Sequence, residues 1–163
     1  MTYSPLIAVW SSTTLPAGAS GTALVVGDTP AQKLVKINTW TVPGPTQDVA
    51  APSVYGYLAL VGKLASLQTY AASAPATASG LAARQFFALL AIPSFQTFET
   101  SNPAVYSAVS AWLAAWAGDA NTGITASDVS AILALAATSS AWTASVGLPT
   151  PLNANDVAAA GLS

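Results

Sequence analysis

Histidine and cysteine are both absent from the 163 residues of this chain. The chain therefore lacks the usual general base near neutral pH, the thiolate nucleophile, disulfide bonds and the commonest metal ligand. Charge is almost as scarce, since Asp, Glu, Lys and Arg together make up 6% of the residues, against about a quarter in an ordinary globular domain. We therefore expect a protein that is not an enzyme and that uses no cofactor and no metal ion.

The low charge also bears on how the chain is used. Hydrophobic residues make up 53% of the sequence, which is ample for a core, and the outer surface is left mainly to Ala, Ser, Thr and Gly. A free monomer with such a surface has little charge to keep it in solution. A subunit whose surface is covered by neighbours on several sides needs little surface charge. The composition therefore predicts an oligomeric protein whose partners are other subunits of the same assembly.

Two other kinds of partner are disfavoured. The net charge is −2 and the four cations are scattered, so no basic strip is present to neutralise the phosphates of a nucleic acid. The mean hydropathy of +0.54 raises the question of a membrane span. The uncharged stretch 129–155 is long enough, but Ser, Thr, Gly and Pro interrupt it and no Lys or Arg flanks it. We expect neither nucleic-acid binding nor a membrane span.

Residues 1–27 differ from the rest of the chain. Two short runs in this segment, 6–10 and 22–26, are rich in branched and aromatic residues and are typical of β-strands, and a turn-rich connector separates them. The sequence predicts an extended or β-hairpin arm over 1–27, followed by a helical domain over 28–163. Whether the arm pairs within the chain or with a neighbour's sheet edge stays open. The candidate interface residues are Leu6, Ile7, Val9, Trp10, Leu24, Val25 and Val26.

The fold class predicted for the remainder is mainly α, a compact bundle of about five short helices. Apolar residues at helical spacing place the helices at about 31–40, 52–72, 79–91, 103–117 and 126–137, with a short terminal helix after Asn153. Asn102 before Pro103, and Thr125 before Asp128, are typical helix starts. Gly56 and Gly62 lie within the longest of these helices, where each lowers the helix propensity by about 1 kcal/mol.

One loop deserves a test as a metal site. Asp119 and Asn121 occupy the first and third positions of a calcium-binding loop. The required glycine, however, falls at the fifth position, as Gly123, instead of the sixth. Ser130 stands at the twelfth position, where a bidentate Glu is required. Too few charged oxygen atoms remain for a tight site. The loop is better explained as the approach to a capped helix.

Other combinations of reactive residues are weaker. Nucleophilic catalysis without histidine would need a pair such as Ser and Lys, and the candidate Lys63 is expected to form a structural ion pair instead. Glu99 is the only Glu, so the paired carboxylates of a glycosidase are not evident. Trp112 and Trp116 share one helix face with apolar residues, which favours a core stripe over an aromatic platform for a ligand.

Several segments resemble small, Ala-rich proteins of tailed bacteriophages: residues 28–34, 37–42, 56–64 and 155–162. The resemblance implies a structural or adaptor subunit of the virion, assembled in the host cytoplasm, with a place in the tail or tail tip rather than the capsid. The resemblance assigns no functional role to any single residue of this chain. Two alternatives stay open, namely a receptor- or glycan-binding module with exposed aromatic residues, and a membrane-active helical protein.

Overall fold

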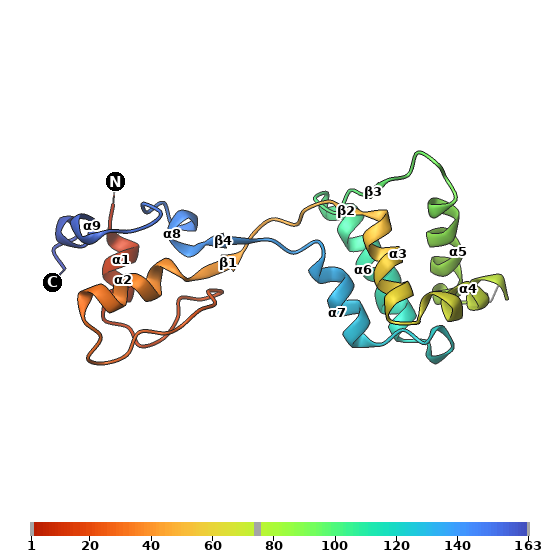
Figure 1. Cartoon of the computed structure of the whole chain (residues 1–163), viewed down its shortest axis with the longest axis horizontal. Coiled ribbons are helices and arrows are strands. Elements are labelled where there is room, and N and C mark those ends of the chain that lie inside the picture. The colour runs from red at the N-terminus through yellow and green to blue at the C-terminus, as the bar shows by residue number, and fades with distance from the viewer. Residues whose placement is uncertain (1, 74–75, 163) are drawn as a thin grey trace. The chain divides into compact units, whose positions relative to one another are not determined.

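The computed structural model describes residues 2–73 and 76–162, which fall into two compact units, each with its own hydrophobic core. Unit 1 combines both ends of the chain, up to Gly44 and from Thr138 onward, whereas unit 2 is the continuous segment Pro45–Ala137 (Figure 1). The predicted boundary after residue 27 is therefore wrong. It fails because the segments at the two ends of the chain share one core, a long-range contact that leaves no local sign in the sequence.

The prediction of a mainly α fold is confirmed. Unit 1 contains helices α1 (Ser4–Trp10), α2 (Pro30–Asn38), α8 (Trp142–Ser145) and α9 (Ala154–Ala159), and strands β1 (Thr41–Pro43) and β4 (Ser139–Ala141). Unit 2 contains β2 (Val49–Ala50), α3 (Ala51–Leu60), α4 (Leu64–Ala72), α5 (Ala78–Leu90), β3 (Thr97–Phe98), α6 (Pro103–Ala117), the 3₁₀ turn η1 (Ala120–Thr122) and α7 (Ala126–Ala134). Among the described residues, each unit holds one two-stranded antiparallel sheet, β1 with β4 and β2 with β3.

The first predicted β-run is a helix. Pro5 lies in the first turn of α1, and Leu6, Val9 and Trp10 follow at a spacing of three and four residues, so all three share one buried face. A five-residue apolar run is compatible with either a strand or a helix, and the neighbouring core selects the helix here. An extended N-terminal arm is therefore not what this segment forms.

The second predicted β-run, 22–26, is irregular. Leu24 is buried in the core of unit 1, and Val25 begins a turn that closes with a hydrogen bond from the Asp28 N–H to the Val25 carbonyl. A single bridge, Ser20 to Thr41, joins the connector to the edge of β1. Burial of Leu24 and hydrogen bonds of Thr22 and Val25, and not strand pairing, hold this stretch in place.

Three buried tryptophans, Trp10, Trp40 and Trp142, contribute to the core of unit 1. Trp40 and Trp142 meet edge to face with ring centroids 5.4 Å apart, and both are almost fully buried. The Trp40 indole N–H donates to the carbonyl of Thr22 at 2.8 Å, which satisfies the polar atom that burial would otherwise strand. The irregular connector thus contributes both an acceptor and an apolar side chain to this core.

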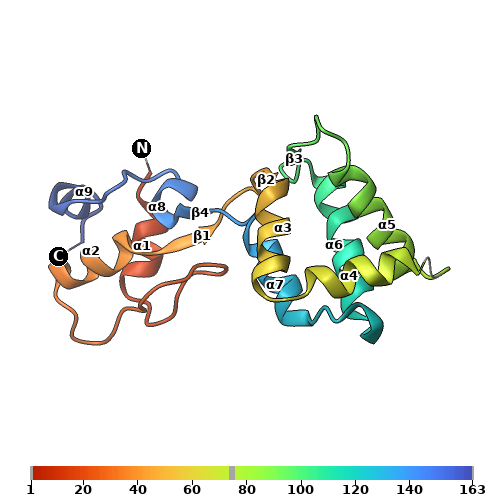
Figure 2. The ribbon, with the colours of Figure 1, turned by 45° about the vertical axis from the view of Figure 1, so that its right-hand side comes forward.

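In unit 2 the predicted helix 52–72 is divided into α3 and α4. The division falls at Gly62, whose φ of +72° ends α3 in a left-handed turn. The other predicted helices agree with α2, α5, α6 and α7 within a few residues at each end. Helix α6 packs against α5 and α7, and α5 packs against α4 (Figure 2). No helix of the described residues is long and apolar enough to cross a membrane.

Candidate functional site

The predicted interface residues do not form one surface. Leu6, Val9, Trp10 and Leu24 are buried in the core of unit 1, whereas Ile7, Val25 and Val26 are 49%, 55% and 92% exposed. The buried four were misassigned because short apolar runs look the same whether they cover a neighbouring subunit or their own core. Only the last three remain candidates for contact with a neighbour.

Val26 lies exposed in a turn that hydrogen bonds close. The Val25 N–H donates to Asp28 Oδ2 at 2.7 Å, and Gly27 adopts a φ of +98° that an L-residue rarely takes. Lys36 forms a salt bridge of 2.8 Å with the same carboxylate. The hydrogen bond from Lys36, followed by that from Val25, lowers the pKa of Asp28. The turn therefore presents an apolar side chain to solvent on an ordered backbone.

The loop compared with a calcium site has its carboxylate already engaged. Asp119 accepts hydrogen bonds from the Tyr70 hydroxyl, from Ser79 Oγ at 2.7 Å, and from both the backbone and the amide side chain of Asn121. These bonds, that from Tyr70 first, hold the pKa of Asp119 far below its usual range. Residues 2–73 and 76–162 include no group of three or more acidic side chains placed to hold a metal ion. Asp119 thus ties α4, α5 and η1 together.

The Ser79–Asp119 contact is not a nucleophile with its base. Ser79 is 4% exposed, and a carboxylate with so low a pKa has little tendency to take a proton. Lys63 forms no salt bridge within the described part of the chain. Its charge is a minor cause of the lowered pKa of Asp128, after the hydrogen bond from the Thr125 hydroxyl. The contacts of these groups are structural.

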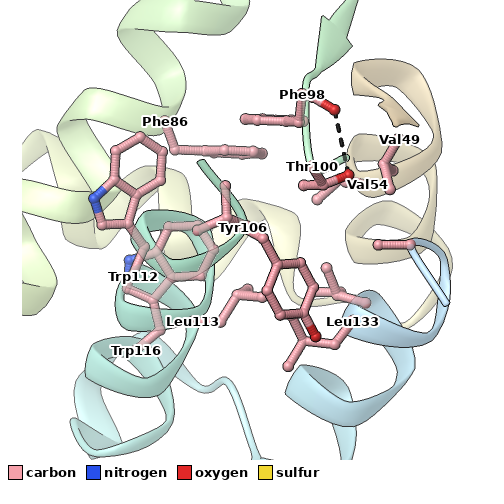
Figure 3. A pocket seen from close by; sticks show the side chains of 13 residues that line it. Val49, Val54, Phe86, Phe98, Thr100, Tyr106, Trp112, Leu113, Trp116 and Leu133 are labelled. Atoms are coloured by element: carbon pink, nitrogen blue, oxygen red, sulfur yellow. Dashed lines mark hydrogen bonds between the residues drawn. The ribbon is translucent and has the colours of Figure 1, made fainter. Parts of the chain in front are cut away.

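The aromatic stripe of α6 divides into two parts. Leu113 and Trp116 are buried, as a core stripe requires, and Phe86 contacts Trp116 edge to face with ring centroids 5.4 Å apart. A cavity of about 20 Å³ lies beside these rings, and Figure 3 shows Phe86 and Phe98 stacked over it. Such a volume is close to the smallest that admits one water molecule. The cavity is too small to hold a substrate.

The other part of the stripe faces outward. Val105, Val109 and Trp112 are half-buried and line a surface groove of about 630 Å³ between α6 and the segment around β3. The opposite wall comes from the loop before β3, from β3 itself and from the residue that follows it: Ser94, Phe95, Gln96, Thr97, Phe98 and Glu99. A second hollow of about 420 Å³ shares Leu89 and Trp112 with the groove. The outward-facing part of the α6 stripe therefore lines a shaped surface.

This groove was missed at the level of sequence. The spacing of Val105, Val109 and Trp112 marks one face of a helix, but it does not tell which half of that face turns inward. The polar and aromatic loop 94–100 is the one visible signal, because it places Phe95 and Phe98 among polar residues outside the predicted helices. The groove forms only because β3 and the loop before it pack beside this face of α6.

The site is thus an apolar groove with one carboxylate, and nothing in its walls supplies a nucleophile–base pair. Among the residues that line it, Glu99 alone carries charge. The arrangement is suited to holding another molecule by shape and apolar contact. Comparison of the chain with protein-family models, with curated proteins and with solved structures finds no match.

Proposed function

We propose that this protein is a non-enzymatic structural or adaptor subunit of a larger assembly. The observation that carries the proposal is the groove between α6 and β3, where half-exposed Val105, Val109 and Trp112 form an ordered apolar wall. Exposed apolar surface that is shaped and held by regular elements is typical of an interaction site. The sparse charge of the chain supports the same conclusion.

The segments that resemble Ala-rich phage proteins specify the assembly further. The proposal places the chain in the virion of a tailed bacteriophage, in the tail or tail tip rather than the capsid, after assembly in the host cytoplasm. Mass spectrometry of purified particles of the encoding phage should detect the chain in fixed ratio to the other tail proteins. Its absence from intact particles, together with its presence in infected cells, would contradict a structural role.

Assembly is also tested in solution. Size-exclusion chromatography with light scattering should show the purified chain as an oligomer, or as a complex when it is co-produced with neighbouring gene products. Self-association should weaken in Val26→Asp if the turn from Val25 to Asp28 takes part in it. A monomer at all concentrations that also fails to bind any co-produced phage protein would remove the proposal.

A second candidate function is a receptor- or glycan-binding module. The observation that favours it is the position of Trp112 and Phe95, which are both half-buried beside Gln96 and Glu99 in one groove. Aromatic rings next to amide and carboxylate groups can stack on sugar rings and hydrogen-bond to their hydroxyls. Binding on a glycan array that is lost in Trp112→Ala would support this function over the structural one.

A further inference from the structure

We propose that the groove beside β3 receives an extended peptide segment of a partner subunit, which adds to the free edge of β3 as a third strand and sets a Lys or Arg against Glu99. The inference rests on the proposed function and names the partner that this site takes. It follows from three features of the groove: an open strand edge, an apolar wall and a single unpaired carboxylate.

The open edge follows from the register of the β2–β3 pair. Val49 faces Phe98 and Ala50 faces Thr97 in an antiparallel ladder, and the Ala51 N–H donates to the Gln96 carbonyl at 2.8 Å. Hydrogen-bonded pairs alternate with non-hydrogen-bonded pairs in such a ladder, so Thr97 belongs to a non-hydrogen-bonded pair. Its N–H and C=O therefore point away from β2.

Nothing in the described residues covers that edge. Thr97 lines the groove, and no hydrogen bond outside the β2–β3 pair reaches its backbone within residues 2–73 and 76–162. A free N–H and C=O on a strand edge form a ready template for another strand. Peptides that bind in this way gain affinity from main-chain hydrogen bonds and specificity from pockets for alternate side chains.

The apolar wall supplies such pockets. An added strand sends alternate side chains to the two faces of the sheet. Side chains on the same face as Phe98 would meet Val105, Val109 and Trp112 of α6 across the groove. The volume of about 630 Å³ falls in the ordinary range for ligand clefts, about 300–1,000 Å³. β-Branched or other apolar residues at alternate positions of the partner fit this wall.

The charge of the groove selects the residue on the other face. Glu99 directly follows β3 and lies two positions after Thr97, and both side chains are exposed whereas Phe98 between them is buried. The Glu99 carboxylate makes no hydrogen bond or ion pair within the described part of the chain, and no Lys or Arg lines the groove. A basic side chain on the added strand, opposite Glu99, would complete a cross-strand pair of opposite charge.

Backbone substitution at Thr97 gives the sharpest test. Proline is tolerated on an edge strand when the missing N–H faces outward, so Thr97→Pro should remove the donor and leave the β2–β3 bonds in place. Thr97→Val keeps the N–H and is the matched control. The probe is a fluorescein-labelled nonapeptide of alternating Val and Thr with one central Lys, measured by anisotropy with the full-length protein. Thr97→Pro should weaken binding at least tenfold, and Thr97→Val less than twofold.

A charge exchange tests the second contact. Glu99→Lys should reverse the preference of the protein, so that a nonapeptide with a central Glu binds better than the one with a central Lys. Leu60→Ala changes an exposed apolar residue outside the groove and should leave both affinities unchanged. Circular dichroism of each variant must match the parent protein. Equal binding of both peptides by the parent and by Glu99→Lys would overturn the role of Glu99.

The outcomes separate this inference from the proposed function. If the protein assembles with its partners in Thr97→Pro as well as in the parent, the subunit role stands and the strand-addition site is refuted. If the groove binds glycans in a manner that depends on Trp112 but not on the Thr97 N–H, the occupant is a carbohydrate and the inference is likewise refuted. A protein that is monomeric and without partners, yet binds the peptide, refutes the structural role alone.

Discussion

At the scale of single residues, the aspartates of this protein serve as hydrogen-bond acceptors within the fold, and Glu99 alone does not among the described residues. Half of the six acidic side chains are bonded to a tyrosine hydroxyl from another part of the chain. The pairs are Tyr3–Asp156, Tyr57–Asp128 and Tyr70–Asp119. Two of these acids also close capping boxes at the starts of α7 and α9. These carboxylates thus stabilise helix starts and contacts between elements.

Asp119 gives a prediction that depends on pH. Its pKa in the folded protein lies far below the value of about 3.9 for an unfolded chain. The stability that this carboxylate contributes is therefore fully present above the unfolded pKa, and it is lost as the pH falls toward the folded pKa. We expect Asp119→Asn to lower the urea midpoint at pH 7 and to make the acid side of the stability profile flatter than in the parent protein.

Urea denaturation followed by circular dichroism, at steps from pH 7 to pH 2.5, measures both effects. Glu99→Gln is the control because its carboxylate is exposed and makes no hydrogen bond among the described residues; its stability profile should follow the parent protein. A variant Asp119→Asn with an unchanged acid slope would show that the contacts with Tyr70 and Ser79 do not persist in solution.

At the scale of elements, two glycines in one predicted helix have opposite roles. Gly56 has an ordinary helical conformation inside α3, whereas Gly62 has a φ of +72° where α3 ends. A Cβ atom added at either position would meet nothing within 4 Å. Steric contact therefore plays no part in the comparison, and the difference comes from the backbone alone.

We expect Gly62→Ala to destabilise the protein by about 1 kcal/mol, because an L-residue in the left-handed region costs about 1–2 kcal/mol. Gly56→Ala should stabilise it by about 0.5–1 kcal/mol, because alanine loses less conformational entropy in a helix. Chemical denaturation of both variants at pH 7 tests the two signs. A stabilising Gly62→Ala would mean that α3 and α4 form the single helix that the sequence pattern predicts.

The elements also show which local signals can be trusted. The helix starts at Thr29, Asn102, Thr125 and Asn153 are visible in the sequence, because a capping side chain bonds to a backbone N–H only two or three residues away. The run 6–10 carries no such signal, and its apolar residues fit a strand as well as a helix. Its conformation is decided by Trp142, Leu148 and other residues far along the chain.

At the scale of the whole molecule, the sequence of unit 2 interrupts that of unit 1. The Gly44 N–H donates to the Thr138 carbonyl at 2.9 Å, and the Gln47 N–H donates to the Ala136 carbonyl at the same distance. The two chain crossings between the units are therefore adjacent. Unit 2 is continuous and has a core of its own, whereas unit 1 needs both ends of the chain.

We therefore expect a polypeptide of residues 45–137 to fold on its own. It should show helical circular dichroism and one cooperative thermal transition, because every buried residue of its core lies within the segment. Leu58→Ala in this fragment should lower its stability by about 2–5 kcal/mol, as is usual when a fully buried leucine is truncated. A fragment that stays unfolded, with a broad and uncooperative melt, would show that unit 2 requires unit 1.

The sequence by itself determined the mainly α class, the helix starts at Thr29, Asn102, Thr125 and Asn153, and the absence of histidine and cysteine chemistry. Each of these depends on residue type or on contacts within a few positions of the chain. The tertiary structure alone decided that Leu6 and Trp10 belong to a helix in a core, that residues 2–44 join 138–162, and that β3 lies beside α6 to form a groove. These features depend on which distant segments share a core, and local patterns carry no record of that choice.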